Sequence, residues 1–349
     1  MAIKISIEMN NKFRKDLTIV SEQSADDLVN LIFSQGSVTL LGYSNSSFCL
    51  CKEYIDCDVD YSFRVQSGIL LAMNRYSTID FNIELDKVTI EGKDKDGSMK
   101  RRAQIKINTD TTANYQADLY NSIIKQLRSG YACNSLEHLR QFYKISKVNP
   151  KGERGVIISN NQFYTCGEGY KFYATTDMPF DCFILSEDLI SLVEFVGVDD
   201  NILYLQGSYI IAKNTNDCYF GVRTGIPQEG IRDLESIVKQ EPILSLTVPI
   251  NEVKQSLRSI KDDKTGTSRV IFQVSKGNIV VGQKMSVFVM PVEFKNVNGR
   301  EIQDITLDFK LFNKLLQTVD AGIESNIKVY NRFITMTTSE KSLLIIGRS

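Results

Sequence analysis

TVPINEVKQSLRSIKDD, residues Thr247–Asp263, opens the stretch that decides the fold. Its apolar residues recur every three or four positions, which predicts an amphipathic helix. Two strand-like runs follow. A second helix is predicted next, at Leu307–Asp320 (LDFKLFNKLLQTVD), and three more strand-like runs come after it. The predicted strands of this part of the chain are Ser268–Val274, Asn278–Lys284, Asn326–Tyr330, Phe333–Thr337 and Ser342–Ile346.

The same order, one helix and then several short strands, recurs in the first two thirds of the chain. The predicted helices are Asn11–Ser21 and Val65–Tyr76 in the first third, and Ser135–Val148 and Ser186–Val196 in the middle third. Turn residues separate the strands, which predicts antiparallel meanders. The strands predicted here are Val38–Tyr43, Phe48–Tyr54, Cys57–Phe63, Ile79–Leu85, Lys87–Gly92, Gln104–Asn108, Gly155–Ser159, Gln162–Cys166, Lys171–Thr176, Ile202–Gln206, Tyr209–Lys213 and Cys218–Arg223.

A supersecondary unit that repeats along the chain predicts a repeated domain. The sequence therefore predicts an α+β protein of three similar domains, at residues 1–126, 127–242 and 243–349. Thr109–Leu127 and Pro227–Pro242 fall between repeats and are expected to be connectors.

The composition is ordinary for a globular protein, with 42% hydrophobic and 24% charged residues among 349. No apolar run approaches the roughly 18 residues that span a bilayer. The first residues, MAIKISIEMNNKFRK, lack an apolar signal core, so we expect a cytoplasmic protein. The net charge of −1 excludes a protein that binds nucleic acid through bulk basicity, but it does not fix where the charges lie.

Cysteine and histidine usage limits the possible chemistry. The chain has seven cysteines and no C-x-x-C pair, which favours reduced thiols that are mostly buried. The single histidine, His138, excludes a zinc site with two histidines from one chain, and its charged surroundings predict a surface position. We expect no metal and no cofactor.

Enzyme motifs are weak. Asp58 and Asp60, like Asp94 and Asp96, form D-x-D patterns that could hold a divalent cation, and a metal-dependent enzyme would need them. Such patterns arise often by chance, and the second pair lies in a charged stretch that predicts a solvated hairpin loop. No G-x-x-x-x-G-K-[ST] phosphate-binding loop is present.

One segment carries a family resemblance. Arg223–Val253, RTGIPQEGIRDLESIVKQEPILSLTVPINEV, resembles the junction between the second and third domains of bacterial-type DNA polymerase sliding clamps. Gly225, Pro227 and Ile237–Val238 occupy places similar to the family's connector, although its aromatic residues are missing. The order of elements after it, including PVEF, and the end at Ser349 soon after the last strand are also similar to the family. The missing aromatic residues of the connector indicate a divergent member of the family, such as a phage-encoded clamp.

The resemblance implies three clamp domains, each with two helices packed on antiparallel sheets, that close into a ring. A head-to-tail homodimer would encircle duplex DNA and tether a polymerase, without enzymatic activity. The alternative that remains is a β-rich virion or assembly protein, which would show neither a ring nor salt-dependent DNA binding.

In this family, helices on the inner wall contact phosphates without reading bases. Arg140, Lys144 and Lys147 are spaced four and three apart, so they share one helix face, and Lys254, Arg258 and Lys261 repeat that spacing. The predicted helix at Ser186–Val196 does not fit a DNA-binding surface, because its charged residues are all acidic. The predicted DNA-binding residues are Lys12, Arg14, Lys15, Arg64, Arg75, Arg140, Lys144, Lys147, Lys254, Arg258, Lys261, Lys310 and Lys314.

The family also binds short peptide motifs of the polymerase and the clamp loader, in an apolar pocket near the end of the chain. Its members usually end near Met-Pro-Met-Arg-Leu, whereas this chain ends Ile345–Ile346–Gly347–Arg348–Ser349, so the apolar character is kept while the partner motif could differ. The pocket residues implied by position are Thr165, Gly167, Tyr170, Val238, Pro242, Ile345, Ile346 and Gly347.

Overall fold

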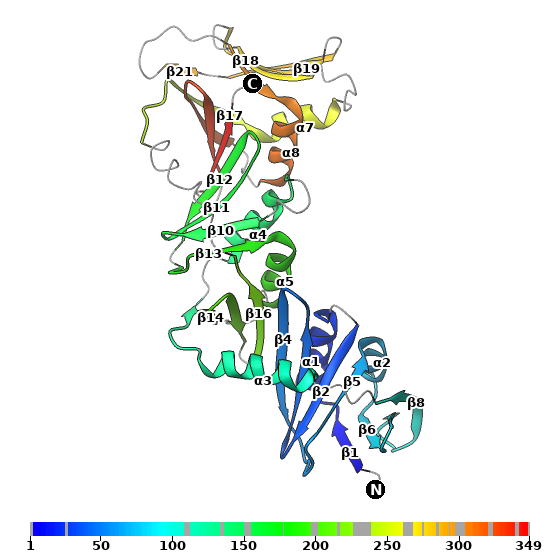
Figure 1. Ribbon diagram of the computed structural model, residues 1–349. Coiled ribbons are helices and arrows are strands. Elements are labelled where there is room, and N and C mark those ends of the chain that lie inside the picture. Colours follow the sequence, from blue (N-terminus) through cyan, green and yellow to red (C-terminus); the bar gives the residue numbers. More distant parts are fainter. Residues whose placement is uncertain are drawn as a thin grey trace. The chain divides into compact units, whose positions relative to one another are not determined.

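The computed structural model is an α+β protein whose strands pair antiparallel in four sheets (Figure 1). It divides into two compact units, each built from two segments of the chain. Unit 1 contains Met1–Asn134 and Ser191–Thr224, and unit 2 contains Ser135–Ile190 and Gly225–Ser349. The structure describes residues 3–24, 27–107, 112–132, 136–149, 155–176, 178–196, 202–214, 217–225, 239–260, 268–273, 276–283, 286–292, 294–296, 304–319, 324–338 and 342–347.

Unit 1 contains an eight-stranded sheet, ordered β5-β2-β3-β4-β16-β15-β14-β9, and a four-stranded sheet, ordered β1-β6-β7-β8. Its strands are β1 (Ile3–Glu8), β2 (Leu28–Ser34), β3 (Ser37–Tyr43), β4 (Ser47–Tyr54), β5 (Tyr61–Gln66), β6 (Thr78–Ile83), β7 (Lys87–Lys93), β8 (Met99–Lys106), β9 (Tyr131–Ala132), β14 (Ile202–Gln206), β15 (Tyr209–Lys213) and β16 (Cys218–Arg223). Its helices are α1 (Asn11–Glu22), α2 (Ser67–Met73) and α3 (Thr112–Lys125).

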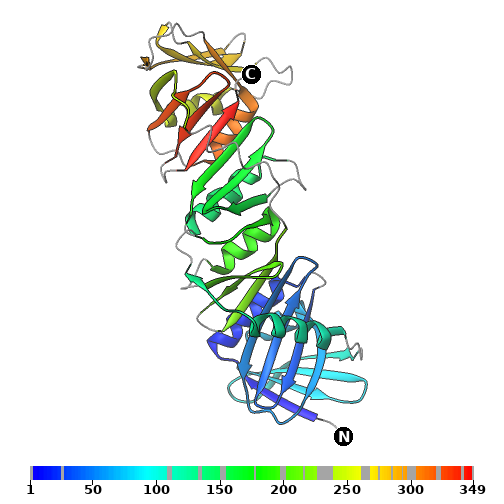
Figure 2. The same cartoon turned by 60° about the vertical axis from the view of Figure 1, so that its left-hand side comes forward.

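Helices cover both faces of the eight-stranded sheet. Helix α1 begins after Asn10, whose side chain accepts a hydrogen bond from the Phe13 backbone nitrogen, and packs against β3 and β4. On the opposite face α3 crosses the strands (Figure 2). Tyr120 of α3 stacks on Phe48 with the ring centres 4.2 Å apart. The apolar residues that α1 buries are Phe13, Leu17 and Val20.

Unit 2 contains a nine-stranded sheet, ordered β13-β10-β11-β12-β25-β24-β23-β17-β21, and a four-stranded sheet, ordered β20-β19-β18-β22. Its strands are β10 (Gly155–Ser159), β11 (Gln162–Gly167), β12 (Tyr170–Thr175), β13 (Cys182–Leu185), β17 (Leu244–Pro249), β18 (Arg269–Gln273), β19 (Asn278–Gln283), β20 (Ser286–Pro291), β21 (Phe294–Asn296), β22 (Ile305–Asp308), β23 (Glu324–Val329), β24 (Phe333–Thr337) and β25 (Leu343–Gly347). Its helices are α4 (Leu136–Ser146), α7 (Ile250–Ser259) and α8 (Phe309–Thr318), and α5 (Ser186–Val196) is divided between the units.

Aromatic side chains fix α4 on the nine-stranded sheet. The Phe142 ring lies 4.6 Å from Phe172 and 5.4 Å from Phe163, measured between ring centres, and all three side chains are fully buried. Helix α8 buries its apolar face in the same unit, and the Asp308 carboxylate caps it by accepting a hydrogen bond from the Leu311 backbone nitrogen. The buried residues of α8 are Phe309, Phe312, Leu315 and Leu316.

Most predicted elements are confirmed, but three helix starts were predicted too early, two of them in unit 2. Thr247–Pro249 belongs to strand β17, so α7 begins at Ile250, and Leu307–Asp308 ends strand β22 before α8. Thr247–Pro249 is part of a strand because residues 244–249 alternate between buried and less buried positions, with the two-residue period of a strand. Both helices also end earlier than predicted, α7 at Ser259 and α8 at Thr318, and the predicted ends at Asp263 and Asp320 lie outside the described residues.

One predicted connector is wrong. Residues 112–125, within Thr109–Leu127, form α3. Its apolar residues at 117, 120, 124 and 127 follow helical spacing, so the sequence contained the signal. The second predicted helix starts at Ser67 instead of Val65, because Val65 pairs with Val29 in the sheet. The described strands that were not predicted are β1, β2, β9, β13, β17, β20, β21 and β22.

The expectation that the cysteines are reduced is wrong for one pair. Cys51 on β4 and Cys218 on β16 form a disulfide between strands that face each other directly. The sequence alone does not predict this disulfide, because the two cysteines are 167 positions apart. Of the free cysteines that the structure describes, Cys166 is exposed, and the buried ones are Cys49, Cys57 and Cys182.

Each of the two larger sheets joins strands from different thirds of the chain. Strands β14–β16 continue the sheet of β2–β5, and strands β10–β13 continue the sheet of β17 and β23–β25. The middle third therefore shares its hydrogen bonds between both units. Among the helices that the structure describes, none is long and apolar enough to cross a bilayer.

Candidate nucleic-acid interface and peptide-binding surface

Helix α4 and Lys147, the residue that directly follows it, carry three of the predicted cations. Leu139, Phe142 and Ile145 are buried, which turns the opposite face of the helix outward. On that face Lys144 and Lys147 are exposed, and Arg140 is half-buried. The four-and-three spacing therefore produces one polar face, as expected for a 3.6-residue helical repeat.

Helices α7 and α8 repeat this arrangement. Val253 and Leu257 are buried in α7, while Arg258 is exposed and Lys254 is half-buried. On α8, Lys310 and Lys314 are exposed. Lys261 lies outside the described residues. Helix α8 contacts both α4 and α7, and Figure 1 shows the three helices following one another along unit 2.

Three of the exposed cations at these helices contact neutral groups. The Lys147 ammonium lies 4.2 Å from the centre of the Tyr143 ring, and the Lys314 ammonium donates to the Val148 carbonyl at 2.6 Å. The Arg258 Nε donates to the Gln317 side chain at 2.8 Å. No carboxylate within the described part of the chain forms an ion pair with the five exposed cations. We call them the basic helix row: Lys144, Lys147, Arg258, Lys310 and Lys314.

Lys254 differs from that row, because its ammonium donates to the Val319 carbonyl at 2.9 Å and is half-buried. The acidic helix α5 differs in charge. Glu187 and Glu194 are exposed, and Asp188 is half-buried, so α5 presents negative charge to solvent. A helix of this kind repels phosphate instead of attracting it.

The cations of unit 1 are engaged within the fold. The Lys12 ammonium forms ion pairs with Asp16, at 3.2 Å, and with Glu53. Burial by itself lowers the pKa of Lys12, but the hydrogen bonds and charges of the two carboxylates raise it overall. The Arg64 guanidinium bonds Asn30 at 3.1 Å and the Tyr43 hydroxyl at 2.6 Å.

The remaining predicted cations of unit 1 lie on and near α1 and α2. Arg14 donates to the backbone carbonyls of Met9 and Tyr76, so it joins the start of α1 to the end of α2. Lys15 is half-buried. Arg75 is exposed, and its guanidinium carbon lies 5.0 Å from the centre of the Tyr76 ring.

Strands β11, β12 and β25 bring together six of the eight predicted pocket residues. Tyr170 pairs with Ile346, and the Gly347 nitrogen donates to the Gly169 carbonyl at 2.8 Å. Thr165 and Gly167 lie on the neighbouring strand β11. Pro242 is half-buried just before β17, and Val238 lies outside the described residues.

These six residues do not share one face of the sheet. The Tyr170 hydroxyl donates to the Asn149 side chain at 2.8 Å beneath α4, and Thr165 and Ile346 are buried on that same side. Burial raises the pKa of Tyr170, so it stays a neutral phenol at physiological pH. A side chain at Gly167 would collide with Asn149, since its Cβ would lie 1.9 Å from the Asn149 Oδ1.

The opposite face of these strands carries an aromatic and aliphatic cluster, which we call the outer patch. Strand alternation separates it from the α4 side. Tyr164 and Ile345 lie at its centre, and half-buried side chains surround them. The outer patch consists of Ile157, Tyr164, Tyr173, Phe333, Leu343 and Ile345.

Neither a known family model nor a curated protein sequence matches the chain. Solved structures do. DNA polymerase III subunit beta from Pseudomonas aeruginosa superposes with a TM-score of 0.74 at 10% identity, covering 99% of this chain and 100% of that one. A putative DNA polymerase III beta subunit from Eubacterium rectale gives 0.75 at 11% identity, with 99% of both chains covered. The chain has the sliding-clamp fold.

A third clamp structure is similar over the same length. The Helicobacter pylori beta clamp, solved bound to a DNA ligase peptide, gives a TM-score of 0.71 at 12% identity and covers 99% of this chain and 100% of that one. The predicted fold class is therefore confirmed for the full length of the chain. At 10–12% identity, this similarity establishes the clamp fold and leaves function to be argued from the residues.

Possible metal ligands of this clamp-fold chain lie away from the D-x-D motifs. Asp96 accepts hydrogen bonds from the backbone and side chain of Ser98, which makes it a turn residue. Among the described residues, the group close enough to hold a metal ion is Asp16 with Cys51 and Cys218, whose ligand atoms lie within 4.8 Å of one another. The disulfide occupies both sulfur atoms, so they are not thiolate ligands in this state.

Proposed function

We propose that this protein is a DNA sliding clamp, a processivity factor that tethers a polymerase to duplex DNA without reading its sequence. The observation that carries the proposal is the full-length match to clamp structures, with TM-scores of 0.70 to 0.75 over at least 99% of the chain. The basic helix row supplies the chemistry that such a role requires, because its charges face solvent and form no ion pair with a carboxylate among the described residues.

Two exposed edge strands support closure into a ring. Strand β8 lies at the edge of the four-stranded sheet of unit 1, and β20 lies at the edge of the four-stranded sheet of unit 2. On β20 the side chains of Val287, Phe288 and Val289 are 55%, 38% and 55% exposed. An apolar edge strand is a template for a further strand. In our proposal β20 of one protomer pairs with β8 of its partner, and two such head-to-tail contacts close the ring.

The proposed contact with DNA is electrostatic. Lysine and arginine side chains that neutralise phosphates release condensed counterions, so binding weakens as salt rises, with a slope of about 0.9 per contact. The basic helix row contributes five such charges, and the half-buried Arg140 and Lys254 lie on the same helices, α4 and α7. Lys12 and Arg64 contribute less in this proposal, because both make hydrogen bonds within the fold.

The proposed partner peptides, from a polymerase and a clamp loader, bind near strand β25. The outer patch offers aromatic and aliphatic side chains of the kind that hold a few apolar anchors of a peptide. One similar clamp was solved with a DNA ligase peptide, which supports peptide binding by this fold. The mechanism is topological and not enzymatic: a ring that holds the polymerase near the template raises its effective concentration.

The native mass and retention on circular DNA test the proposal together. We expect a particle of about twice the 39.5 kDa chain mass. Once loaded on nicked circular DNA, the protein should remain bound at high salt and should be lost when the circle is linearised. A monomer at high micromolar concentration, or equal retention on linear and circular DNA, would contradict the clamp function.

A further inference from the structure

The disulfide lies inside unit 1, beneath helix α1. Cys51 and Cys218 face each other on neighbouring strands of the eight-stranded sheet, with their Cα atoms 4.3 Å apart. Both side chains are fully buried. Because hydrogen bonds along the strand pair hold the two Cα atoms, the sulfur atoms stay adjacent whether or not they are bonded.

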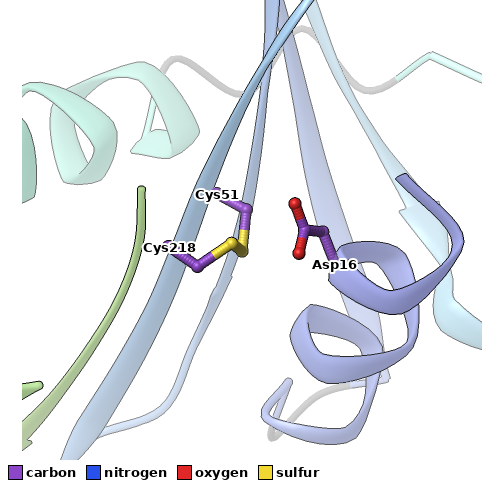
Figure 3. Close-up of side chains that lie close together, drawn as sticks. All are labelled: Asp16, Cys51 and Cys218. Carbon is purple, nitrogen blue, oxygen red and sulfur yellow. A yellow bond between two sulfur atoms is a disulfide. The ribbon is translucent and has the colours of Figure 1, made fainter. Parts of the chain in front are cut away.

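A buried carboxyl group accompanies the two sulfur atoms. Figure 3 shows the Asp16 side chain extending from α1 toward the disulfide. Asp16 is 0% exposed, and its Oδ1 atom has no hydrogen-bond partner in the described part of the chain. Burying a carboxyl group with an unsatisfied oxygen is unfavourable for folding, so packing alone does not account for it.

The cluster around Asp16 holds one cation, Lys12, and two carboxyl groups, those of Asp16 itself and of Glu53. Lys12 bonds both Asp16 and Glu53, and Glu53 follows Cys51 by two residues on the same face of β4. The pKa of Asp16 is raised to about 7, first by burial and then by the Glu53 carboxyl, while Lys12 acts in the opposite direction. Cys49 also faces this cluster, and burial raises the pKa of its thiol. One lysine does not neutralise two carboxylates, so the cluster keeps a proton near neutral pH.

The disulfide is near an exposed turn, although it is buried. Cys218 is the first residue of β16, and the exposed Asp217 precedes it with a φ of 57°. Local opening at the start of a strand requires fewer broken contacts than opening at its centre. A small reductant therefore has a route to the sulfur atoms that does not need global unfolding.

We propose that the Cys51–Cys218 disulfide is a reversible redox link, opened by a dithiol reductant, and that Asp16 supplies the proton to the departing cysteine thiolate. A thiolate of the reductant attacks one sulfur atom, the S–S bond breaks, and the other cysteine leaves and takes the Asp16 proton. The second thiol of the reductant then forms the disulfide of the reductant and frees the first cysteine. Two protons and two electrons pass from the dithiol to the protein, and Asp16 regains its proton from the reductant thiols.

Counting thiols tests whether the link is reversible. The native full-length protein is treated with dithiothreitol, or with oxidised glutathione after reduction, and is then acid-quenched and alkylated in denaturant. With seven cysteines in the chain and two in the disulfide, we expect five alkylated thiols when the link is closed and seven when it is open. Cys218→Ser, with six cysteines left, should give six in both conditions. A link that opens only after urea unfolding, or that never forms, overturns the proposal.

The pH dependence of reduction tests the role of Asp16. The rate of opening by a water-soluble phosphine is measured between pH 5.5 and 8.5 for the native sequence and for Asp16→Asn, and the ratio of the two rates cancels the titration of the reductant. Below pH 7 the protonated carboxyl donates, and above it the carboxylate repels the departing thiolate, so the ratio should fall about tenfold or more as pH rises. A ratio that does not vary with pH overturns the role of Asp16.

Two further variants keep that test decisive. Glu22→Gln removes an exposed carboxylate from the same helix and should leave the rates unchanged. Lys12→Gln leaves Asp16 in place but removes the cation that lowers its pKa, so the fall in rate should move to higher pH. Circular dichroism must show that every variant is folded. If the reduction rate of Lys12→Gln falls at the same pH as that of the native sequence, Asp16 is not the titrating group.

Discussion

The first helix of unit 1 and the helices of unit 2 use their cations in opposite ways. On α1, Lys12 is paired with two buried or nearly buried carboxylates, Asp16 and Glu53. At the end of α4, Lys144 and the following Lys147 face solvent and lack a carboxylate partner within the described residues. A lysine on the first helix therefore forms partly buried ion pairs in unit 1, whereas in unit 2 it adds positive charge to the surface.

Reversing the charge of the basic helix row should have the largest effect. Changing Lys144, Lys147, Arg258, Lys310 and Lys314 to Glu should weaken DNA binding about 1000-fold at low salt, because five phosphate contacts are lost and five repulsions are gained. The measurement is fluorescence anisotropy with duplex DNA over a salt series, where the slope should fall by about 4.5.

A matched variant controls for the change in net charge. It reverses five exposed cations that lie outside the helices: Lys52, Arg128, Arg269, Lys328 and Arg332. We expect a much smaller loss, caused only by the long-range field. Equal losses in the two variants would mean that the helices are not the DNA-binding surface.

The pH dependence of stability should reveal the buried carboxyl of unit 1. The pKa of Asp16 is raised from 3.8 to about 7 by burial first and Glu53 second. A group whose pKa is raised in the folded state stabilises the protein fully below its unfolded pKa, and that stability is lost as pH rises through the folded pKa. From pH 4 to pH 8, the native sequence should therefore lose up to about 4 kcal/mol relative to Asp16→Asn.

Urea unfolding of both proteins at each pH measures this difference. Lys144→Gln, which changes a solvent-exposed group of unit 2, serves as the control and should follow the native curve. Parallel curves for the native sequence and Asp16→Asn would show that the Asp16 carboxyl does not titrate in this range.

Removing the cation of the cluster should destabilise unit 1 only. Lys12→Met leaves Asp16 and Glu53 together without a neutralising charge, and we expect a loss of about 2 kcal/mol at pH 8. This is less than the 3–5 kcal/mol typical of fully buried pairs, because the Lys12 side chain is 35% exposed. Lys144→Met should change the free energy of unfolding by less than about 0.5 kcal/mol. If both variants lose a similar amount of unfolding free energy, Lys12 is no more important for stability than the exposed Lys144.

Single substitutions should show the smallest effect. Lys144→Gln should lower the salt slope of DNA binding by about 0.9, as one lost phosphate contact does. Lys12→Gln should leave that slope unchanged, because its ammonium is already paired with carboxylates. The same anisotropy series measures both. A lower slope for Lys12→Gln would show that the cluster opens toward DNA.

The sequence predicted the helices of unit 2 better than the strands around them. Val253 and Leu257 lie on the buried face of α7, as their spacing requires, and the polar faces of α4 and α8 follow in the same way. The starts of α7 and α8 were predicted too early, because each helix directly follows a strand and apolar residues continue across the boundary. The connector that is α3 was missed although its apolar spacing was present.

The candidate site was predictable in part. The cation spacing on α4, α7 and α8 is a local property of the sequence and predicted a polar face on each helix, whereas the structure decided which of these cations are exposed. The peptide pocket was predicted by position in a resembling family, and strand register then divided its residues between two faces, with Tyr170 beneath α4 and Ile345 on the outer patch.

By itself, the sequence determined the α+β class, the repeated order of elements and the polar faces of the helices. These depend on residues three or four positions apart, and the pitch of the helix fixes their geometry. Only the tertiary structure decided which strands pair, that Cys51 meets Cys218 across 167 residues, and that Lys12 is neutralised while Lys144 is not. Those outcomes depend on contacts between distant segments, and the choice of a strand's partner leaves no periodic trace in the sequence of either strand.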